Sequence, residues 1–356
     1  MSPDTLTLRR ILSAGLLAPS ADNRHHLRFE FDRAALRLHS TDAASWAAQP
    51  HRKFLALLAC GAVVENMVLR AAELGHAMTL DGPPGEEAPG CVARLHWTPT
   101  RTPPDPLGRC IEVRHTNRRF YRRAALPKFV LVELAAAAAA VAGAELRWLD
   151  EPSARALALQ AIRVAETERF RRRALHAELF DAVRFDVGWQ HTATEGLPPA
   201  ALEVEWPMRL PFALLRHWCV MRLAIALGAH RALGWRAGAL PCALAPHLGL
   251  LVMRDEASDR ATLQGGRAFQ RLWLAATAAG LALQPLAAAT TLLQQRAGDG
   301  RVDAATQARL RTLLSKIGGG AERRPLMLFR LGEAAPPSAV AGRRPLADYL
   351  ASDYLA

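Results

Sequence analysis

The sequence predicts an α+β fold made of two tandem repeats, and three observations support that prediction. Residues 60–75 and 265–280 carry the same pattern of small and apolar residues, about 205 positions apart. Short segments around both stretches alternate between polar and apolar residues, which is typical of half-buried strands. The chain has 356 residues, of which 51% are hydrophobic and 22% charged, so it can form two cores of ordinary size.

The two matched stretches are expected to be long helices. Gly61 aligns with Gly266 inside the pattern, and Gly75 aligns with Gly280 at its end. A glycine just after a helix favours a left-handed cap. Gene duplication explains the match, and a chance likeness between two alanine-rich helices is the alternative.

The flanking segments complete the two repeats. A first helix is expected over residues 1–17, and a helix over 131–141 opens the second half. The expected strands are 28–31, 36–39 and 92–97 in the first half, and 145–149, 248–253 and 326–331 in the second. We therefore divide the chain into repeats at 1–106 and 107–356, each with helices that cover an antiparallel or mixed sheet.

Two segments fall outside the repeat. Residues 98–106 are rich in proline and threonine and are expected to link the halves. Residues 155–244 have no counterpart in the first half and contain four of the eight tryptophans. We expect this insert to be helical, and it either covers a site as a lid or fills space between the halves.

Charge and cysteine content limit the partners. Lys+Arg 45 against Asp+Glu 33 gives a net charge of +12, which suits nucleic acid, an anionic membrane or a phosphorylated small molecule. No aromatic platform or recognition-helix pattern accompanies the arginines, so we expect no nucleic acid partner. The most apolar part, residues 210–253, is interrupted by Arg216, Arg222, Arg231 and Arg236, so no window within it reaches the ~18 uncharged residues that a bilayer span needs. The first 17 residues also lack the pattern of a secretion signal. The five scattered cysteines form no disulfide framework, so we expect a cytoplasmic protein with no membrane partner.

Metal chemistry and several nucleotide-binding classes are not expected. His176 and Glu178 form an H-x-E sequence, but Pro241-Cys242 is not followed by the second cysteine that a tetrahedral zinc site needs. The chain also contains no G-x-G-x-x-G after a strand, no G-x-x-x-x-G-K-[ST], no H-E-x-x-H and no G-x-S-x-G.

Three other stretches combine into a predicted site for a phosphate and a flat ring. Arg114, Thr116 and Arg118 offer guanidinium forks and a hydroxyl that suit a monophosphate, and a solvated basic turn is the alternative. Arg343 and Arg344 form a second basic cluster on a turn. Small residues after the first helix either let the backbone approach a flat ligand or simply end the helix; they include Pro19, Ser20, Ala21 and Asn23.

In their order along the chain, these stretches resemble the FMN-dependent nitroreductase family. The likeness rests on A-P-S-x-x-N before an R-F strand, on R-x-T-N-R-R-F, and on a G-x-A-x-Q-x-x-x-L-A-A-x-x-x-G-L helix followed by Gln284-Pro285-Leu286. The strand at 328–331 and the Arg343-Arg344-Pro345-Leu346 sequence complete the set. The resemblance covers about 8–149 and 265–350, and the single-chain, two-repeat Acg-like branch is the most similar.

The resemblance implies a nitroreductase-like fold in which the two subunits of a homodimer are fused as an intrachain pseudo-dimer. It implies that Arg114, Thr116 and Arg118 bind the phosphate and ribityl chain of FMN, with a further phosphate contact from Arg343 and Arg344. Three residues would lie against the flavin ring, namely Gln284, Pro285 and Leu286. The loop contributed by the other half would consist of Pro19, Ser20, Ala21 and Asn23.

Only one complete set of these contacts is present in the chain. The first half has the loop but no basic cluster before its opening helix. The second half has both basic clusters, but only Ala142-Gly143-Ala144 stands where the loop belongs. We therefore expect one FMN per chain between the halves, with a positive phosphate end and an apolar ring end.

The implied activity is hydride transfer from NAD(P)H through FMN to a nitroaromatic, a quinone or a similar flat acceptor, by a monomer or a homodimer. The flavin carries the chemistry, so no catalytic side chain is named. The alternative is a flavin-storing protein whose insert seals the ring with Trp189 or Trp206. Where the family usually has Gln-Pro-Trp after the loop, this chain has Arg24-His25-His26, so His25 or His26 is either a proton donor or structural.

Overall fold

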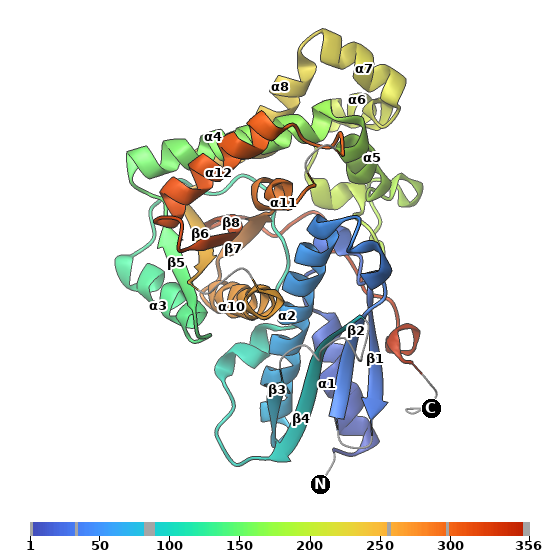
Figure 1. The fold of residues 1–356 in the computed structure, drawn as a ribbon, viewed down its shortest axis with the longest axis vertical. Helices are drawn as coiled ribbons and strands as arrows, with labels where there is room; N and C mark the ends of the chain where they lie inside the picture. Colours follow the sequence, from blue (N-terminus) through green and yellow to red (C-terminus); the bar gives the residue numbers. More distant parts are fainter. Residues whose placement is uncertain (1–2, 33–34, 82–89, 255–257, 297–298, 352–356) are drawn as a thin grey trace.

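The computed structural model describes residues 3–32, 35–81, 90–254, 258–296 and 299–351, and contains two four-stranded antiparallel sheets (Figure 1). The first sheet has the order β1-β2-β4-β3, and the second has the order β5-β6-β8-β7. The strands of the first are β1 (Leu27–Asp32), β2 (Ala35–Ser40), β3 (His76–Asp81) and β4 (Cys91–Pro99). Those of the second are β5 (Ala144–Trp148), β6 (His247–Met253), β7 (Ala282–Leu286) and β8 (Arg324–Gly332).

The two halves repeat one order of elements, namely helix, two strands, helix, two strands. The helices of the first half are α1 (Thr5–Leu16) and α2 (Pro50–Glu73), and those of the second are α3 (Lys128–Ala139) and α10 (Asp259–Ala278). The strand orders of the two sheets correspond position by position. The predicted α+β class with two tandem repeats is confirmed.

The central helices α2 and α10 pack directly on each other and join the two halves (Figure 1). A Cβ on Gly61 would lie 2.9 Å from the Cα of Gly266, and a Cβ on Gly266 would lie 2.9 Å from the Cα of Leu58. The two aligned glycines therefore let the helix backbones touch at equivalent points. Gly75 and Gly280 both follow their helices with positive φ, 78° and 71°, as the cap prediction requires.

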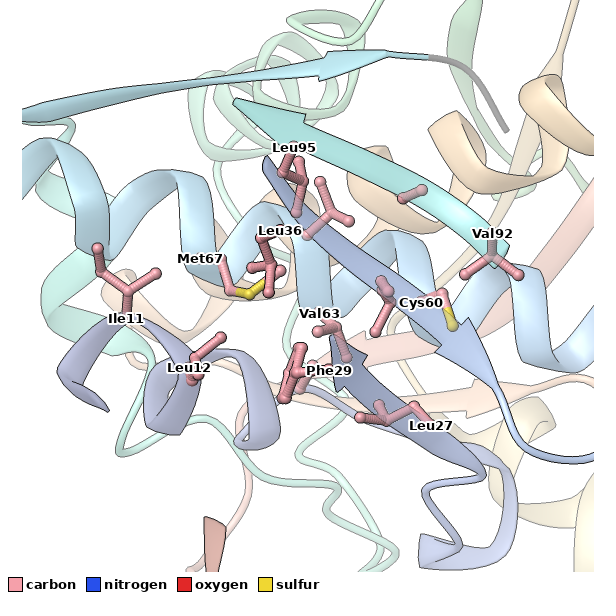
Figure 2. Close-up of a cluster of buried hydrophobic side chains, with 14 of the residues drawn as sticks. Ile11, Leu12, Leu27, Phe29, Leu36, Cys60, Val63, Met67, Val92 and Leu95 are labelled. Carbon is pink, nitrogen blue, oxygen red and sulfur yellow. The ribbon is translucent and has the colours of Figure 1, made fainter. Parts of the chain in front are cut away.

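The core of the first half lies between α1, α2 and the first sheet. Figure 2 shows Ile11 and Leu12 of α1 facing Val63 and Met67 of α2, with Phe29 between them. Apolar residues recur on α1 at helical spacing, so one face of the helix is buried. By length and composition α2 could cross a bilayer, but 72% of its most apolar window is buried inside the protein.

The second half carries two insertions in its repeat. The larger lies between β5 and β6 and is helical, as predicted, and the smaller lies between β7 and β8. The helices of the larger are α4 (Pro152–Arg171), α5 (Arg173–Asp181), α6 (Arg209–Leu215), α7 (Trp218–Ala226), α8 (Ala229–Gly234) and α9 (Leu240–Leu244). Those of the smaller are α11 (Ala288–Leu293) and α12 (Ala304–Gly318), and α12 lies along α4 (Figure 1).

Some boundaries differ from the prediction. Thr98 and Pro99, expected in the linker, extend β4 and pair with Ala77 and His76 of β3. The helix expected from residue 131 begins at Lys128, because Pro127 pre-sets the backbone before its first turn. Strands β3 and β7 and helix α11 were not predicted.

The C-terminal segment returns from the second half to the first. The amide of Ala351 donates a hydrogen bond of 2.9 Å to the carbonyl of Phe29 on β1, and η8 (Leu346–Tyr349) packs beside that strand. The residues just before η8 therefore lie beside the end of α1.

Candidate functional site

A cavity with a volume of about 1010 Å³ lies where the two halves meet. Its wall includes residues from α2, α10 and β7, the loop after α1, the insert and the C-terminal segment. The volume is at the upper end of the ~300–1,000 Å³ range of small-molecule sites. The cavity has room for a ligand of cofactor size.

All but one of the predicted site residues line this cavity. They come from four separate parts of the chain: Pro19, Ser20, Ala21 and Asn23; Arg114, Thr116 and Arg118; Gln284, Pro285 and Leu286; and Arg343. Arg344 is the exception. Its side chain lies 3.8 Å from Glu195 and stacks on the ring of Tyr349, because the extended backbone imposed before Pro345 turns adjacent side chains to opposite sides. The expectation that Arg344 faces the site is corrected.

Hydrogen bonds from the side chains of His25 and Asn23 fix the loop after α1. The Nδ1 of His25 forms a hydrogen bond of 3.2 Å with the Oγ of Ser20, and its Nε2 forms one of 3.0 Å with the carbonyl of Ala18. Asn23 donates to the carbonyls of Gly196 and Gly342 at 3.1 and 3.3 Å. Asp22 and Asn23 both adopt positive φ, a backbone that Asn and Asp tolerate better than most residues. His25 is structural in this arrangement, and the exposed His26 does not line the cavity.

Arg343 fixes the end of α1. Its guanidinium donates to the carbonyls of Leu16 at 2.7 Å and Ala18 at 2.9 Å, and also to Asn23 Oδ1. The carbonyls at a helix C-terminus carry partial negative charge and favour a cation there. Burial lowers the pKa of Arg343 to about 10, so the side chain stays charged at neutral pH.

Arg114 brings a second cation, which is buried, to the same place. It is 7% exposed, donates to the carbonyl of Leu17 at 3.0 Å, and lies with its Cζ 4.5 Å from the centre of the Trp273 ring. Burial, with the nearby charge of Arg343, lowers the pKa of Arg114 to about 9. Within the described ranges neither arginine forms an ion pair with a carboxylate, and Arg114 Nε is buried without a partner. Two such cations at one wall of a cavity favour an anionic ligand.

A mixed charge cluster also lines the cavity. Arg118 donates to the carbonyl of Ala201 at 3.2 Å, and burial lowers its pKa. Arg169 pairs with Glu166 at 3.1 Å. Burial raises the pKa of Asp22, and the charges of Arg169, Arg24 and Arg118 oppose that shift. This part of the wall offers both hydrogen-bond donors and acceptors.

Another part of the cavity wall is mostly apolar. Pro285 and Leu286 of β7 line it together with Leu55 and Leu58 of α2 and Phe269 of α10. Gln284 accepts a hydrogen bond of 2.7 Å from the Nε of Arg330, which fixes the orientation of its amide. A flat apolar ring fits this part of the wall better than the part that carries Arg114 and Arg343.

The insert supplies one wall of the cavity. Phe170, Leu175 and Leu179 contribute apolar surface from α4 and α5, and Phe212 contributes it from α6. Trp189 and Trp206 are not among the lining residues, and Trp206 is 79% exposed. The tryptophan seal considered for a storage protein is therefore absent from the described wall.

Several cavity residues were not found by sequence reasoning. His51, at the start of α2, is 4% exposed, has no hydrogen-bond partner on either ring nitrogen, and lies 3.7 Å from Glu178 of α5. Glu178 also pairs with Arg301, and these partners lower its pKa to about 2 despite burial. Arg330 does not line the cavity, but it donates to the lining residue Gln284 and is fully buried, with Cζ 4.0 Å from the centre of the Tyr121 ring. An arginine inside the apolar run 326–331 was the visible sign of a special position.

No group of three or more His, Cys, Asp or Glu side chains that could hold a metal ion is found in the described ranges. His176 instead lies with its Nε2 2.8 Å from the carbonyl of Leu215, and Cys242 is buried, where desolvation raises the pKa of its thiol to about 12.

The state of His25 gives a pH-dependent prediction. Burial lowers the pKa of His25 to about 3, whereas the unfolded chain binds a proton at this residue near pH 6.5. Below pH 6.5 the unfolded state therefore holds more protons, and the stability falls as the pH drops toward 3, by up to about 1.4 kcal/mol per pH unit. Urea titrations between pH 7 and pH 5 should show a weaker pH dependence for His25→Gln than for His26→Gln. Equal slopes in the two variants would contradict a buried neutral His25.

Among known proteins, similarity to this chain is found only with solved structures. No family model and no curated protein matches the chain. The structure is similar to the FMN-dependent nitroreductase NfnB from Mycobacterium smegmatis in complex with NADPH, at 20% identity and a TM-score of 0.39, over 67% of this chain and 94% of that one. It is also similar to a nitroreductase with bound FMN from Desulfitobacterium hafniense, at 12% identity and a TM-score of 0.38, over 68% and 96% of the two chains. It is also similar to an iodotyrosine deiodinase bound to FMN and 3-iodo-L-tyrosine, at 15% identity and a TM-score of 0.36, over 67% of this chain and 95% of that one.

Proposed function

We propose that this chain is an FMN-dependent oxidoreductase that uses NAD(P)H and reduces a flat acceptor such as a nitroaromatic or a quinone. The cavity and the sequence motifs that line it support this proposal. The main support is the pair of arginines, the buried Arg114 and the half-buried Arg343, which line the cavity without a carboxylate partner in the described ranges.

The residues present fit FMN at both ends of the cavity. A phosphate would offset the two arginine charges, and the Nε of Arg114 is a buried donor without a partner. The apolar end around Pro285 and Leu286 suits a three-ring system. We propose one FMN per chain, in an Acg-like arrangement with contacts from both repeats.

The chain itself would bind, orient and shield the cofactor. Arg114, Thr116 and Arg118 would hold its phosphate and ribityl chain, while the loop braced by Arg343 would contact it from the first half. When bound, FMN supplies the redox chemistry, with hydride taken from reduced nicotinamide and electrons passed to the acceptor. The apolar wall of the insert would exclude water from the ring end. His51 lines the same cavity, so it can give a proton to a reduced acceptor.

A flavin-storing protein is the second candidate. The size of the insert favours it, since a large insert can cover a bound ring. The position of Trp189 and Trp206 outside the cavity wall favours the enzyme.

Turnover distinguishes the two candidates. We expect the FMN-loaded protein to consume NADPH when nitrofurazone or menadione is added, because the ring end of the cavity is not closed by the two tryptophans. The decrease in NADPH absorbance over time gives the rate of NADPH consumption, and free FMN without the protein is the control. Tightly bound FMN without turnover on either acceptor would contradict the enzyme and leave the storage role.

A further inference from the structure

The outer surface of the insert exposes an unusual number of large apolar side chains. They lie on η6 (Trp206–Met208), on α6, on α7 and around α8. We call the following set the insert face: Trp206, Met208, Leu210, Leu214, Val220, Leu223, Leu227 and Trp235, which are between 38% and 80% exposed. An apolar patch of this kind on a soluble protein commonly marks a contact with another body.

These side chains are not needed to pack the insert. The inner side of α7 already packs, since Met221 is fully buried in a cluster with Phe170 and Phe180, and Trp218 and Ile225 lie against that cluster. Val220 and Leu223 lie on the outer side of the same helix. A surface helix normally has polar residues on that side. The outer side of α7 is therefore apolar although it is exposed.

The stretch that carries the insert face is basic, and Glu205 beside Trp206 pairs with Arg236. Residues 206–254 contain no Asp or Glu. Arg216, Arg222 and Arg231 are exposed within this stretch. Basic residues beside exposed Trp, Leu and Val are typical of helices that lie in the interface of an anionic bilayer.

The position of the face suits a planar surface. In Figure 1, α6, α7 and α8 project at one end of the long axis, and the two chain termini lie toward the other end. We propose that the insert face docks on a membrane that carries anionic lipid headgroups, with its apolar side chains in the headgroup region and its arginines against the phosphates. This proposal replaces the expectation from sequence that the chain has no membrane partner.

The other occupants fit the face less well. A second copy of the chain would bring the same arginines against one another, and the whole chain carries a net charge of +12. An acidic protein would satisfy the charges, but it does not call for so much exposed aliphatic surface. Met208 belongs to both the insert face and the cavity wall, so docking would place the cavity beside the bilayer.

Vesicle binding by the full-length protein tests the proposal. We expect it to sediment with phosphatidylserine-containing vesicles, to bind phosphatidylcholine vesicles much less, and to be released by high salt. The double variant Leu223→Asp/Leu227→Asp should lose roughly tenfold or more of its partition coefficient, since two exposed apolar contacts become acidic. The matched control is Phe129→Asp/Val132→Asp on α3, where both residues are also exposed, and it should bind as the original chain does.

A second measurement does not depend on these substitutions. Cys219 is exposed on α7, so a polarity-sensitive dye on its thiol reports on the insert face in a Cys110→Ser background. We expect the dye emission to shift to the blue on addition of anionic vesicles. No shift, or equal partitioning of the two double variants, would overturn the proposal. Binding to polyglutamate without binding to vesicles would also overturn it, in favour of an acidic protein.

Discussion

Replacing Arg114 by glutamine is expected to weaken FMN binding by about 1.5–3 kcal/mol, or roughly 10- to 150-fold in Kd. The reason is that Arg114 is a buried cation in the cavity wall, without a carboxylate partner in the described ranges. The unliganded protein should change little in stability, because the lost hydrogen bond to Leu17 is offset by relief of the repulsion from Arg343. Titration of FMN fluorescence gives the Kd.

Arg344→Gln is the matched control for this variant. This variant also removes one positive charge, at the residue next to Arg343. The Arg344 side chain, however, lies against Glu195 and Tyr349 and does not line the cavity. We expect the affinity of Arg344→Gln for FMN to stay close to that of the unchanged chain. An equal loss in both variants would mean that net charge alone attracts the cofactor, and the assignment of Arg114 would be wrong.

Replacing Gly266 by alanine is expected to lower the free energy of unfolding by at least about 3 kcal/mol, the upper end of the usual cost of overpacking. The added Cβ would overlap the carbonyl group of Leu58 and lie 2.9 Å from its Cα, and backbone atoms have no rotamer with which to yield. Because α2 and α10 join the halves and form part of the cavity wall, their separation should also reduce FMN binding. Urea unfolding measures the first effect.

Gly318→Ala is the control for the added methyl group. Gly318 ends α12, and the nearest atoms to a Cβ built there lie 3.8 Å away. This variant should be as stable as the original chain or more stable by up to about 1 kcal/mol, because alanine favours a helix. If Gly266→Ala also unfolds at the original urea concentration, the two helices do not cross at their aligned glycines.

The duplication was predictable because it leaves marks in the sequence that do not depend on tertiary contacts. Gly61 and Gly266 meet where the two helices cross, and Gly75 and Gly280 follow the ends of their helices. The structure therefore gives each of the four aligned glycines a physical role. The candidate site followed from motif order. The four stretches that line the cavity are far apart in sequence, and the resemblance to a known family brought them together before the structure did.

The missed features depend on contacts that sequence periodicity does not report. Strand β7 contains Pro285, which weakens a strand pattern. His51 looked like part of a helix start, and its place in the cavity depends on the insert beside it. The different directions of Arg343 and Arg344 follow from the carbonyls at the end of α1 and from Pro345, so only the assembled fold separates a cavity residue from its neighbour.

The flavin content of the purified chain tests the central proposal most directly. After loading with FMN and removal of the excess, the absorbance spectrum and the flavin released on heating should give one FMN per chain, and Arg114→Gln should retain much less. A chain that takes up no FMN would contradict the proposal. Two FMN per chain would contradict a single cavity that needs residues from both halves.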